Sequence, residues 1–466
     1  MADQPNIVLI CVDQWRGDCL SAAGHPVVLT PYLDGWMATG TRFSRAYSAT
    51  PTCVPARAAL FTGLSQEHHG RVGYRDGVPW DYPVTMAGEL SRAGYQSQAV
   101  GKMHVYPERQ RMGFENVALH DGYLHFARSR HSDLADIDDY IPWLREKMGY
   151  DADYIDHGLN CNSIIARPWD KPEYVHPTTW VVTRSLEFLR ERDTDRPFFL
   201  YASFHRPHPP YDPPEWAFQQ YIGQEMPDPP VGDWTDLWAQ YENSVSPESQ
   251  VARYDPRLLQ RARAGYYGHM SHIDQQIERL LEELAGHGDT VVCFVSDHGE
   301  LMGDHHLYRK SLPYEGSAHI PFAIAGPGIP AGVNDSVVEL RDVFPTLLDV
   351  AGGSVSGLDG RSVLPLTRGE SVDWRTQLHG EHTAFGQSIQ WLTDGREKYI
   401  WCSGSGVEQF FDLVADPTES HDLARESSDR LGRWRARMVD VLVDRPEGFV
   451  DAGGLVAGRP VGEVLR

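Results

Sequence analysis

The chain has 466 residues, of which 41% are hydrophobic and 23% are charged. This composition is typical of a folded globular protein with a large core, and it excludes a disordered chain, a collagen-like repeat and a membrane bundle. The formal net charge of −23 repels a polyanion, so we expect no nucleic-acid partner. A small anionic substrate is not excluded, because a few cations or a metal reverse the sign inside one pocket.

The first residues and the cysteines indicate a compartment. The N-terminus has no basic region, and the apolar run 7–12 is too short for a signal sequence or a membrane span. The cysteines have no short paired spacing, which excludes a disulfide framework and a zinc knuckle; they are Cys11, Cys19, Cys53, Cys161, Cys293 and Cys402. We therefore expect a cytoplasmic protein with reduced thiols and no membrane contact.

Buried strands and amphipathic helices alternate through residues 1–374. In Ser271–Ala285 the residues Ile273, Ile277 and Leu284 fall on one face, as in a helix packed on a core. This alternation predicts an α/β catalytic domain, with a large mixed, mostly parallel sheet flanked by helices. Continuous apolar runs predict strands buried on both faces at Ile7–Val12, Gln98–Val100, Phe198–Ser203, Thr290–Ser296 and Pro321–Ala325.

After Trp374 the pattern changes to short alternating strands with turns. Strands are predicted at Gln390–Thr393, Lys398–Cys402 and Gln409–Leu413, followed by a helix from about Ser427 to Val443. Residues 375–466 are therefore predicted to form a small C-terminal antiparallel α+β unit. The tail 455–466 is a candidate contact with a second copy, which is the basis for expecting a homo-oligomer.

Three segments read as long loops over the sheet, where substrate selectivity often resides. They lie near Tyr74-Arg75, Pro107–Pro177 and Pro227–Ser249. The aromatic side chains in or beside them favour packing over pocket lining; they are Tyr106, Tyr123, Trp169, Trp180, Trp234 and Trp238.

Polar residues follow several predicted strands. Ligands of parallel sheets bind beyond the carboxyl ends of the strands, so these residues are candidates for a site. Asp13 and Asp297 are paired carboxylates that favour a hard divalent cation, to which Gln14 adds an amide oxygen and His298 an imidazole nitrogen. Alone, Asp297-His298 would read as a helix N-cap and a solvated histidine. The four segments are Asp13-Gln14, Gly101-Lys102-Met103-His104, His205-Arg206-Pro207-His208 and Asp297-His298.

The segment Cys53-Val54-Pro55-Ala56-Arg57 is the sharpest local motif. Alone, Cys53 would be a small buried hydrophobic residue. Ala56–Phe61 is predicted to open a helix, which places Cys53 just before a helix N-terminus, where an anionic oxygen or sulfur is favoured. Arg57 would point back toward it, or form an ion pair with a nearby aspartate.

With Leu60-x-Thr62-Gly63, this motif resembles the formylglycine-dependent, arylsulfatase-like sulfatase family of the alkaline-phosphatase superfamily. The resemblance extends in order and spacing from residue 6 to about 425, outside the stretch after Pro107. The other matching segments are Asn6–Asp13, Gly101–His104, Pro207-His208-Pro209-Pro210, Ser296–Glu300, Gly303–His306, Lys310, Lys398–Ile400, Phe411–Leu413 and Asp416–Glu419.

The resemblance implies that a separate formylglycine-generating enzyme oxidises Cys53 to Cα-formylglycine. One hydroxyl of the hydrated aldehyde is then the nucleophile, and the second lets the enzyme expel sulfate by C–O cleavage. Arg57 would hold the nucleophile and Lys102 would neutralise sulfate charge, while His104 would take the proton from the second hydroxyl. His208 and Lys310 would contact sulfate and stabilise or protonate the leaving oxygen.

The resemblance also implies one divalent metal ion. Its ligands would be Asp13, Gln14, the modified Cys53, Asp297 and His298. The family's commonest pattern has Asp at the position of Gln14 and often Asn at that of His298. Calcium is the family default, and this departure leaves manganese or magnesium open. The two histidines at 305 and 306 are expected to be structural.

The expected function is hydrolysis of a small aryl or carbohydrate sulfate monoester. A phosphonate monoester or phosphate diester hydrolase of the same superfamily remains open, because Asp13–Arg16 and Asp297-His298 resemble that branch. Lys102 and His104 favour the sulfatase, since the resemblance implies that the phosphonate branch lacks this G-K-x-H segment. The third alternative is a non-catalytic binding protein on the same scaffold, which the complete residue set disfavours.

Overall fold

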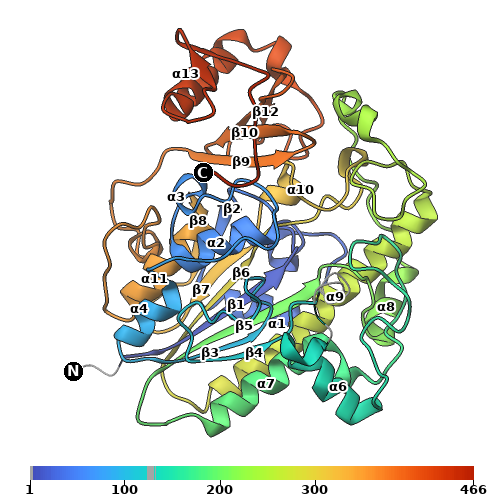
Figure 1. Cartoon of the computed structure of the whole chain (residues 1–466), viewed down its shortest axis with the longest axis vertical. Coiled ribbons are helices and arrows are strands. Elements are labelled where there is room, and N and C mark those ends of the chain that lie inside the picture. Colours follow the sequence, from blue (N-terminus) through green and yellow to red (C-terminus); the bar gives the residue numbers. More distant parts are fainter. Residues whose placement is uncertain (1–3, 123–130, 132, 466) are drawn as a thin grey trace.

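The computed structural model describes residues 4–122, 131 and 133–465. Within them an eight-stranded sheet fills the centre of the molecule, and a four-stranded sheet lies at one end (Figure 1). The strands of the large sheet, in spatial order, are β4 (Asn116–Leu119), β3 (Gln96–Gly101), β5 (Phe198–Pro207), β1 (Asn6–Asp13), β6 (Thr290–Ser296), β7 (Phe322–Ala325), β2 (Thr41–Tyr47) and β8 (Gly332–Glu339).

The large sheet is mixed and mostly parallel, as predicted. The neighbouring strands β3, β5, β1 and β6 all run in the same direction. The strand β7 is antiparallel to both β6 and β2, and β8 is parallel to β2. The carboxyl ends of these four strands therefore lie at the same edge of the sheet.

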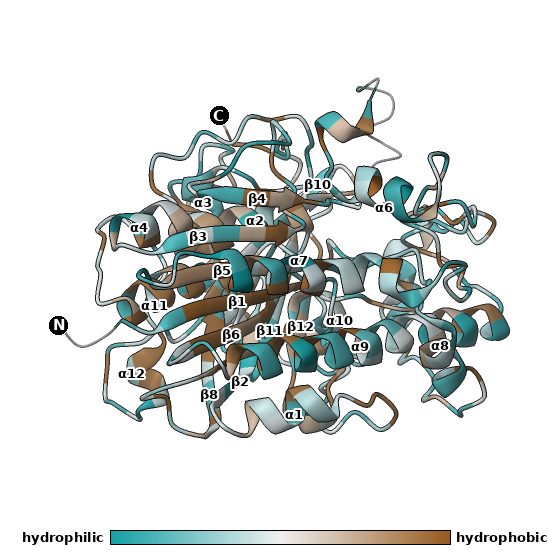
Figure 2. Ribbon diagram, turned by 90° about the horizontal axis from the view of Figure 1, so that it is seen from below, coloured by the Kyte–Doolittle hydropathy of each residue, from teal (hydrophilic) through white to brown (hydrophobic). Residues whose placement is uncertain are grey.

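Alternate residues of β1 enter two different cores. Ile7, Leu9 and Cys11 face the core that contains α2, α4 and α11, whereas Val8 and Ile10 face the core of α7 and α9. Figure 2 shows β1, β5 and β6 as hydrophobic ribbons between these layers, because both faces of each strand are buried. The helices are α1 (Pro31–Met37), α2 (Cys53–Thr62), α3 (Gln66–His69), α4 (Met86–Arg92), α6 (Tyr140–Met148), α7 (Pro177–Glu191), α8 (Glu215–Ile222), α9 (Pro256–Leu284), α10 (Glu315–Ala318), α11 (Val343–Val350), α12 (Leu364–Thr367) and α13 (Ser428–Leu442).

The small sheet is antiparallel and is covered on one side by α13, at the top of Figure 1. Leu431, Trp434 and Met438 of this helix pack on Tyr399 and Phe410 of the sheet. The sheet lies wholly within the predicted C-terminal unit, whose boundary at residue 374 stays a prediction. Its strands are β9 (Leu378–Ala384), β10 (Gln387–Thr393), β11 (Glu397–Cys402) and β12 (Glu408–Asp412), with a separate two-stranded hairpin, β13 (Val450–Asp451) and β14 (Gly454–Leu455).

The strands that are not continuously apolar were not predicted from the sequence. β2 (TRFSRAY) and β8 (GVNDSVVE) carry charged residues at the sheet edge, and β4 is only four residues long. β9 (LHGEHTA) is also polar. The predicted helix Ser271–Ala285 is the second half of α9, and β5 continues past Ser203 to Pro207.

The aromatic residues of the predicted loops pack into cores, as expected. Trp180 and Trp238 are at most 1% exposed, and Trp169 and Trp234 are also buried. Tyr106 packs against the core around α2 and α4. Tyr123 lies outside the described residues.

The C-terminal tail lies on its own chain. The Val72 amide donates to the Glu463 carbonyl at 3.0 Å, and the Leu465 amide donates to the Gly70 carbonyl at 2.8 Å. The tail therefore pairs with the segment that follows α3 in its own chain, and its contact with a second copy stays a prediction.

All six cysteines are buried, and none forms a disulfide within the described part of the chain. No helix in the described part of the chain is both long and apolar enough to cross a membrane.

Candidate active site

The carboxyl ends of the four central strands converge, as the strand-end argument predicted. Asp13 closes β1, Lys102 follows β3, His208 follows β5 and Asp297 follows β6. All four side chains are at most 1% exposed. The backbone ties the ends together, because the His208 amide donates to the Asp13 carbonyl at 3.1 Å.

Helix α2 begins at Cys53, three residues earlier than the sequence analysis placed it. Pro55 is tolerated in the first turn, where its missing N–H would have no helical partner. Cys53 therefore lies within the first turn at the positive end of the helix, with Thr52 in an extended conformation before it. Arg57 is four residues later and lies on the same face.

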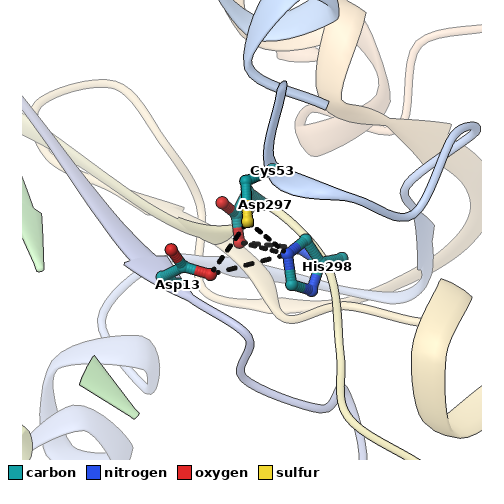
Figure 3. A group of neighbouring side chains, drawn as sticks. All are labelled: Asp13, Cys53, Asp297 and His298. Atoms are coloured by element: carbon teal, nitrogen blue, oxygen red, sulfur yellow. Dashed lines mark hydrogen bonds and ion pairs between the residues drawn. The ribbon is translucent and has the colours of Figure 1, made fainter. Parts of the chain in front are cut away.

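Cys53 points into a cluster with Asp13, Asp297 and His298 (Figure 3). Its Sγ is 3.6 Å from Asp13 Oδ1 and 3.1 Å from His298 Nε2. The four candidate ligand atoms lie within 4.8 Å of one another, and all four residues are buried. Residues from two strand ends and one helix start thus meet at one point.

The donor atoms of this cluster suit a divalent cation. His298 Nδ1 donates to the Gly299 carbonyl at 2.9 Å, which turns the Nε2 lone pair toward the carboxylates. Nε2 is 3.5 Å from Asp13 Oδ1 and 3.7 Å from Asp297 Oδ1. These distances are too long for good hydrogen bonds and match atoms that share one cation.

Gln14 links the cluster to Lys310. Its amide oxygen accepts a hydrogen bond from Lys310 Nζ at 2.5 Å, and its amide nitrogen donates to Glu300. Its backbone N–H donates to Asp297 Oδ1 at 3.1 Å. Gln14 therefore contacts the cluster through its backbone N–H, while its amide oxygen binds Lys310, and its role as a metal ligand stays a prediction.

Arg57 binds the carboxylates of the proposed metal site. An ion pair with an aspartate was one of the two roles that the sequence left open for it. Its Nε donates to Asp297 at 3.0 Å, and Nη2 is 3.9 Å from Asp13. Its Nη1 also donates to the Lys102 carbonyl at 2.8 Å, Tyr201 at 2.9 Å and Ser203 at 3.0 Å. Arg57 thus fixes Asp297 and the end of β3.

Lys102 and His104 follow β3 in a segment without regular secondary structure, and the positive φ of His104 interrupts the extended backbone that was predicted. A Cβ on Gly101 would collide with the Ser203 carbonyl, so only glycine fits there. Lys102 forms an ion pair with Asp13. The Asp121 carboxylate accepts hydrogen bonds from the Met103 and His104 amides, both at 2.8 Å, and His104 has a φ of 55°.

The surroundings favour a negative charge at the Cys53 position. Burial alone would raise the pKa of the thiol, but the charges of Lys102 and Lys310, with a hydrogen bond from His104, lower it well below its ordinary value. Burial would likewise lower the pKa of Lys102, but Asp13 outweighs it and raises that pKa. The site therefore holds an anion beside a fixed cation.

His208 is neutral beside two lysines. Burial, and then the charges of Lys310 and Lys102, lower its pKa well below the ordinary value. Its Nδ1 donates to the Pro209 carbonyl at 2.9 Å. His305 accepts the Gly232 amide at 3.0 Å, in agreement with a structural role.

A second group of buried ligand-type residues, His176, Asp212 and His269, does not suit a metal. His176 Nδ1 accepts the Thr178 amide at 3.1 Å, so its Nε2 carries the proton and offers no lone pair. Asp212 already binds Arg206 through two hydrogen bonds of 2.9 and 3.0 Å. Since Arg206 lies two residues before His208, this network anchors the loop that carries His208.

Several residues at the site were not found from sequence. Tyr201 and Ser203 orient Arg57 but sit in an apolar strand, where they read as core. Asp121 orients His104 from a segment of weak periodicity. The partners of these residues are distant in sequence. The one available signal was the spacing of Tyr201 and Ser203, which lie two residues apart and therefore on one face of the strand, where they can share a partner.

Comparison with known proteins places this geometry in a family. The sulfatase family model matches residues 5–354, and the model for the C-terminal part of N-sulphoglucosamine sulphohydrolase matches residues 303–433. The arylsulfatase of Clostridium perfringens is 45% identical over 98% of both chains. The multifunctional alkaline phosphatase superfamily protein PehA of Trinickia caryophylli is 30% identical over 93% of this chain and 96% of its own.

Among solved structures, the phosphonate monoester hydrolase of Agrobacterium radiobacter superposes with a TM-score of 0.80 at 25% identity. The match covers 98% of this chain and 100% of that one. Its likeness includes both sheets of the present fold. The chain therefore belongs to the sulfatase family of the alkaline phosphatase superfamily and is an arylsulfatase-like hydrolase.

Proposed function

We propose that the chain hydrolyses a sulfate monoester of a small aryl or carbohydrate alcohol, with Cys53 converted to Cα-formylglycine. The observation that carries the proposal is the position of Cys53. It lies at the N-terminus of α2, 3.6 Å from Asp13 and 3.1 Å from His298, among cations that lower its pKa. A sulfate ester needs a nucleophile in such a field, because its oxygens carry negative charge.

The group derived from Cys53 supplies a nucleophilic hydroxyl, and the bound cation polarises the sulfate oxygens. Lys102 neutralises sulfate charge from the end of β3. His104, held by Asp121, takes the proton from the second hydroxyl. Lys310 and His208 face the leaving oxygen, and Lys310 is the cation that stabilises it as it develops charge.

One divalent cation fits between Asp13, Asp297 and His298, with Gln14 and the modified Cys53 completing the set. We propose calcium, because four of these five groups offer oxygen to a hard cation. The imidazole of His298 and the neutral amide of Gln14 keep manganese and magnesium as alternatives. The formylglycine-generating enzyme is the one partner that maturation requires.

Hydrolysis of a phosphonate monoester or a phosphate diester is the second candidate. The similarity to the Agrobacterium phosphonate monoester hydrolase and to PehA supports it. The pairs Asp13-Gln14 and Asp297-His298 also resemble that branch. Lys102 and His104 favour sulfate, because they add a cation and a base beside the nucleophile.

The test compares kcat/KM for para-nitrophenyl sulfate with that for para-nitrophenyl phenylphosphonate, on protein co-expressed with a formylglycine-generating enzyme. We expect the sulfate to be preferred, and Cys53→Ala to abolish turnover of both esters. A strong preference for the phosphonate reverses the order of the two candidates. Intact-mass analysis that finds Cys53 unmodified in a competent host, together with no turnover of either ester, supports a binding protein instead.

A further inference from the structure

A pocket of about 550 Å³ lies beside the proposed catalytic cluster. Its lining comes from five separate parts of the chain: the loop at Tyr74, Gln250 before α9, the residue after Lys310, the β9–β10 hairpin and the C-terminal tail. The residues that matter for the argument are Tyr74, Ser311, His382, Phe385, Arg459 and Glu463.

This pocket adjoins the catalytic cluster at three points. The ring of Tyr74 lies 6.0 Å from the ring of His104, centroid to centroid. Ser311 directly follows Lys310 in the chain. His382 is within 2.7 Å of Thr52 Oγ1, the residue that precedes Cys53. A group attached to a sulfate at the cluster is therefore within reach of this pocket.

The tail forms one wall and is held at several points. Thr383 Oγ1 donates to the Gly462 carbonyl at 3.0 Å, and the Gly458 amide donates to the Ser403 carbonyl at 2.8 Å. The Val72 amide binds the Glu463 carbonyl at 3.0 Å. Because both ends of the segment 458–463 are fixed to other elements, Arg459 is presented from an ordered backbone.

Arg459 is a cation without a carboxylate partner among the residues the structure describes. Its Nε donates to the Gly448 carbonyl at 3.1 Å, and the side chain is otherwise exposed at the pocket. By contrast, Arg75 lies 3.9 Å from Glu463. In a chain with 65 acidic and 42 basic residues, an arginine left unpaired at a pocket suits an anion brought by the ligand.

We propose that this pocket binds the alcohol portion of the sulfate ester, and that Arg459 selects substrates whose alcohol portion carries a second anionic group, a carboxylate or another sulfate. Tyr74 and Phe385 offer aromatic surface to a ring, and the guanidinium offers paired N–H donors to the anion. This inference rests on the proposed sulfatase function. It makes Arg459 a specificity-determining residue outside the catalytic cluster.

The test uses para-nitrophenyl sulfate and an analogue that carries a carboxylate on the ring. We expect Arg459→Gln to lower kcat/KM for the carboxylated ester by about fivefold, the scale of one partly exposed charge pair. Its kcat/KM for para-nitrophenyl sulfate, which lacks the second anionic group, stays unchanged, and Arg459→Lys retains part of the preference. Arg433→Gln, an exposed arginine on α13, is the matched control and changes neither value.

A binding measurement separates this inference from the proposed function. In the Cys53→Ala background, calorimetric titration with the carboxylated ester is expected to give a Kd about fivefold weaker for Arg459→Gln than for intact Arg459. That result supports the pocket even if the wild-type protein turns over neither ester, in which case only the proposed function fails. Equal Kd values for the two variants, or equal losses for the esters with and without the carboxylate, overturn the role of Arg459.

Discussion

Several site residues have a positive φ, a backbone conformation that residues other than glycine rarely adopt. Gln14 has a φ of 72°, His104 a φ of 55°, and Arg309 and Ser311 have φ values of 65° and 91° on either side of Lys310. Such conformations cost of order 1–3 kcal/mol each and persist only where the surroundings impose them. Here the backbone N–H groups of Gln14, Arg309 and His104 donate to the carboxylates of Asp297, Glu300 and Asp121, which hold these conformations in place.

His104 is the residue whose removal tests the proton-transfer step most simply. His104→Ala is expected to lower kcat for para-nitrophenyl sulfate by about 10²- to 10⁴-fold, the usual contribution of a positioned acid–base group. Its ring packs on Tyr74 and not in a main core, so the melting temperature should change little. His306→Ala, a histidine outside the cluster, should keep normal turnover; an equal loss in both variants contradicts the assignment.

Asp212 is expected to matter for stability as well as for His208. Asp212→Ala leaves Arg206 buried without its carboxylate, which costs about 3–5 kcal/mol. Denaturant unfolding should show this loss, and kcat should fall because the loop that carries His208 is released. Asp195→Ala, at an exposed carboxylate, is the control; similar stability in the two variants would refute the anchoring role.

At the scale of the element, the strands and helices that could be predicted are those whose own sequence pattern determines them. β1 and β6 were located nearly to the residue, because strands buried on both faces are continuous apolar runs. β2 and β8 were missed, since both carry charged residues and are held by pairing with neighbouring strands, β2 between β7 and β8, and β8 at the edge. The proposed ligand residues were found because they lie in a motif or at the end of a predicted strand. The pairing of Arg57 with Asp297 could not be predicted, because it joins residues 240 positions apart in the sequence.

The joint between α1 and α9 should make stability depend on pH. Asp274 of α9 accepts the Leu33 amide at 2.7 Å and the Tyr32 amide at 3.2 Å, and burial raises its pKa to about 7. The unfolded chain loses this proton near the ordinary pKa of about 4, while the folded chain keeps it until about 7. The stability contributed by the protonated form is thus complete below about pH 4 and is lost as the pH rises through 7.

Asp274→Asn should remove that dependence. The measurement is the melting temperature of wild type minus that of the variant, taken near pH 5 and near pH 8, and the difference is expected to be smaller or reversed at the higher pH. Glu282→Gln, at an exposed position of the same helix, should show no such trend. A difference for Asp274→Asn that is the same at both pH values contradicts the linkage.

At the scale of the whole molecule, an acidic protein encloses a small electropositive site. The net charge is −23, yet Lys102, Arg57 and Lys310 meet within it and their fields focus an anion toward Cys53. The same enclosure places the buried carboxylates of Asp13 and Asp297 together. A cation between them should therefore stabilise the folded chain by mass action.

Removal of metal tests this directly. Treatment with a chelator is expected to lower the melting temperature and the turnover together, and addition of calcium should restore both. In Asp297→Asn the melting temperature should no longer respond to calcium. A wild-type protein whose melting temperature is the same with chelator and with calcium would refute a metal at this cluster.

The most direct test of the whole account varies the fraction of Cys53 converted to formylglycine, by co-expression with different amounts of the modifying enzyme. Mass analysis of the Cys53 peptide gives the fraction, and released sulfate gives the turnover of para-nitrophenyl sulfate by the same preparations. The account predicts turnover proportional to conversion, reaching zero where the thiol is intact. Turnover that stays constant while conversion changes would contradict it.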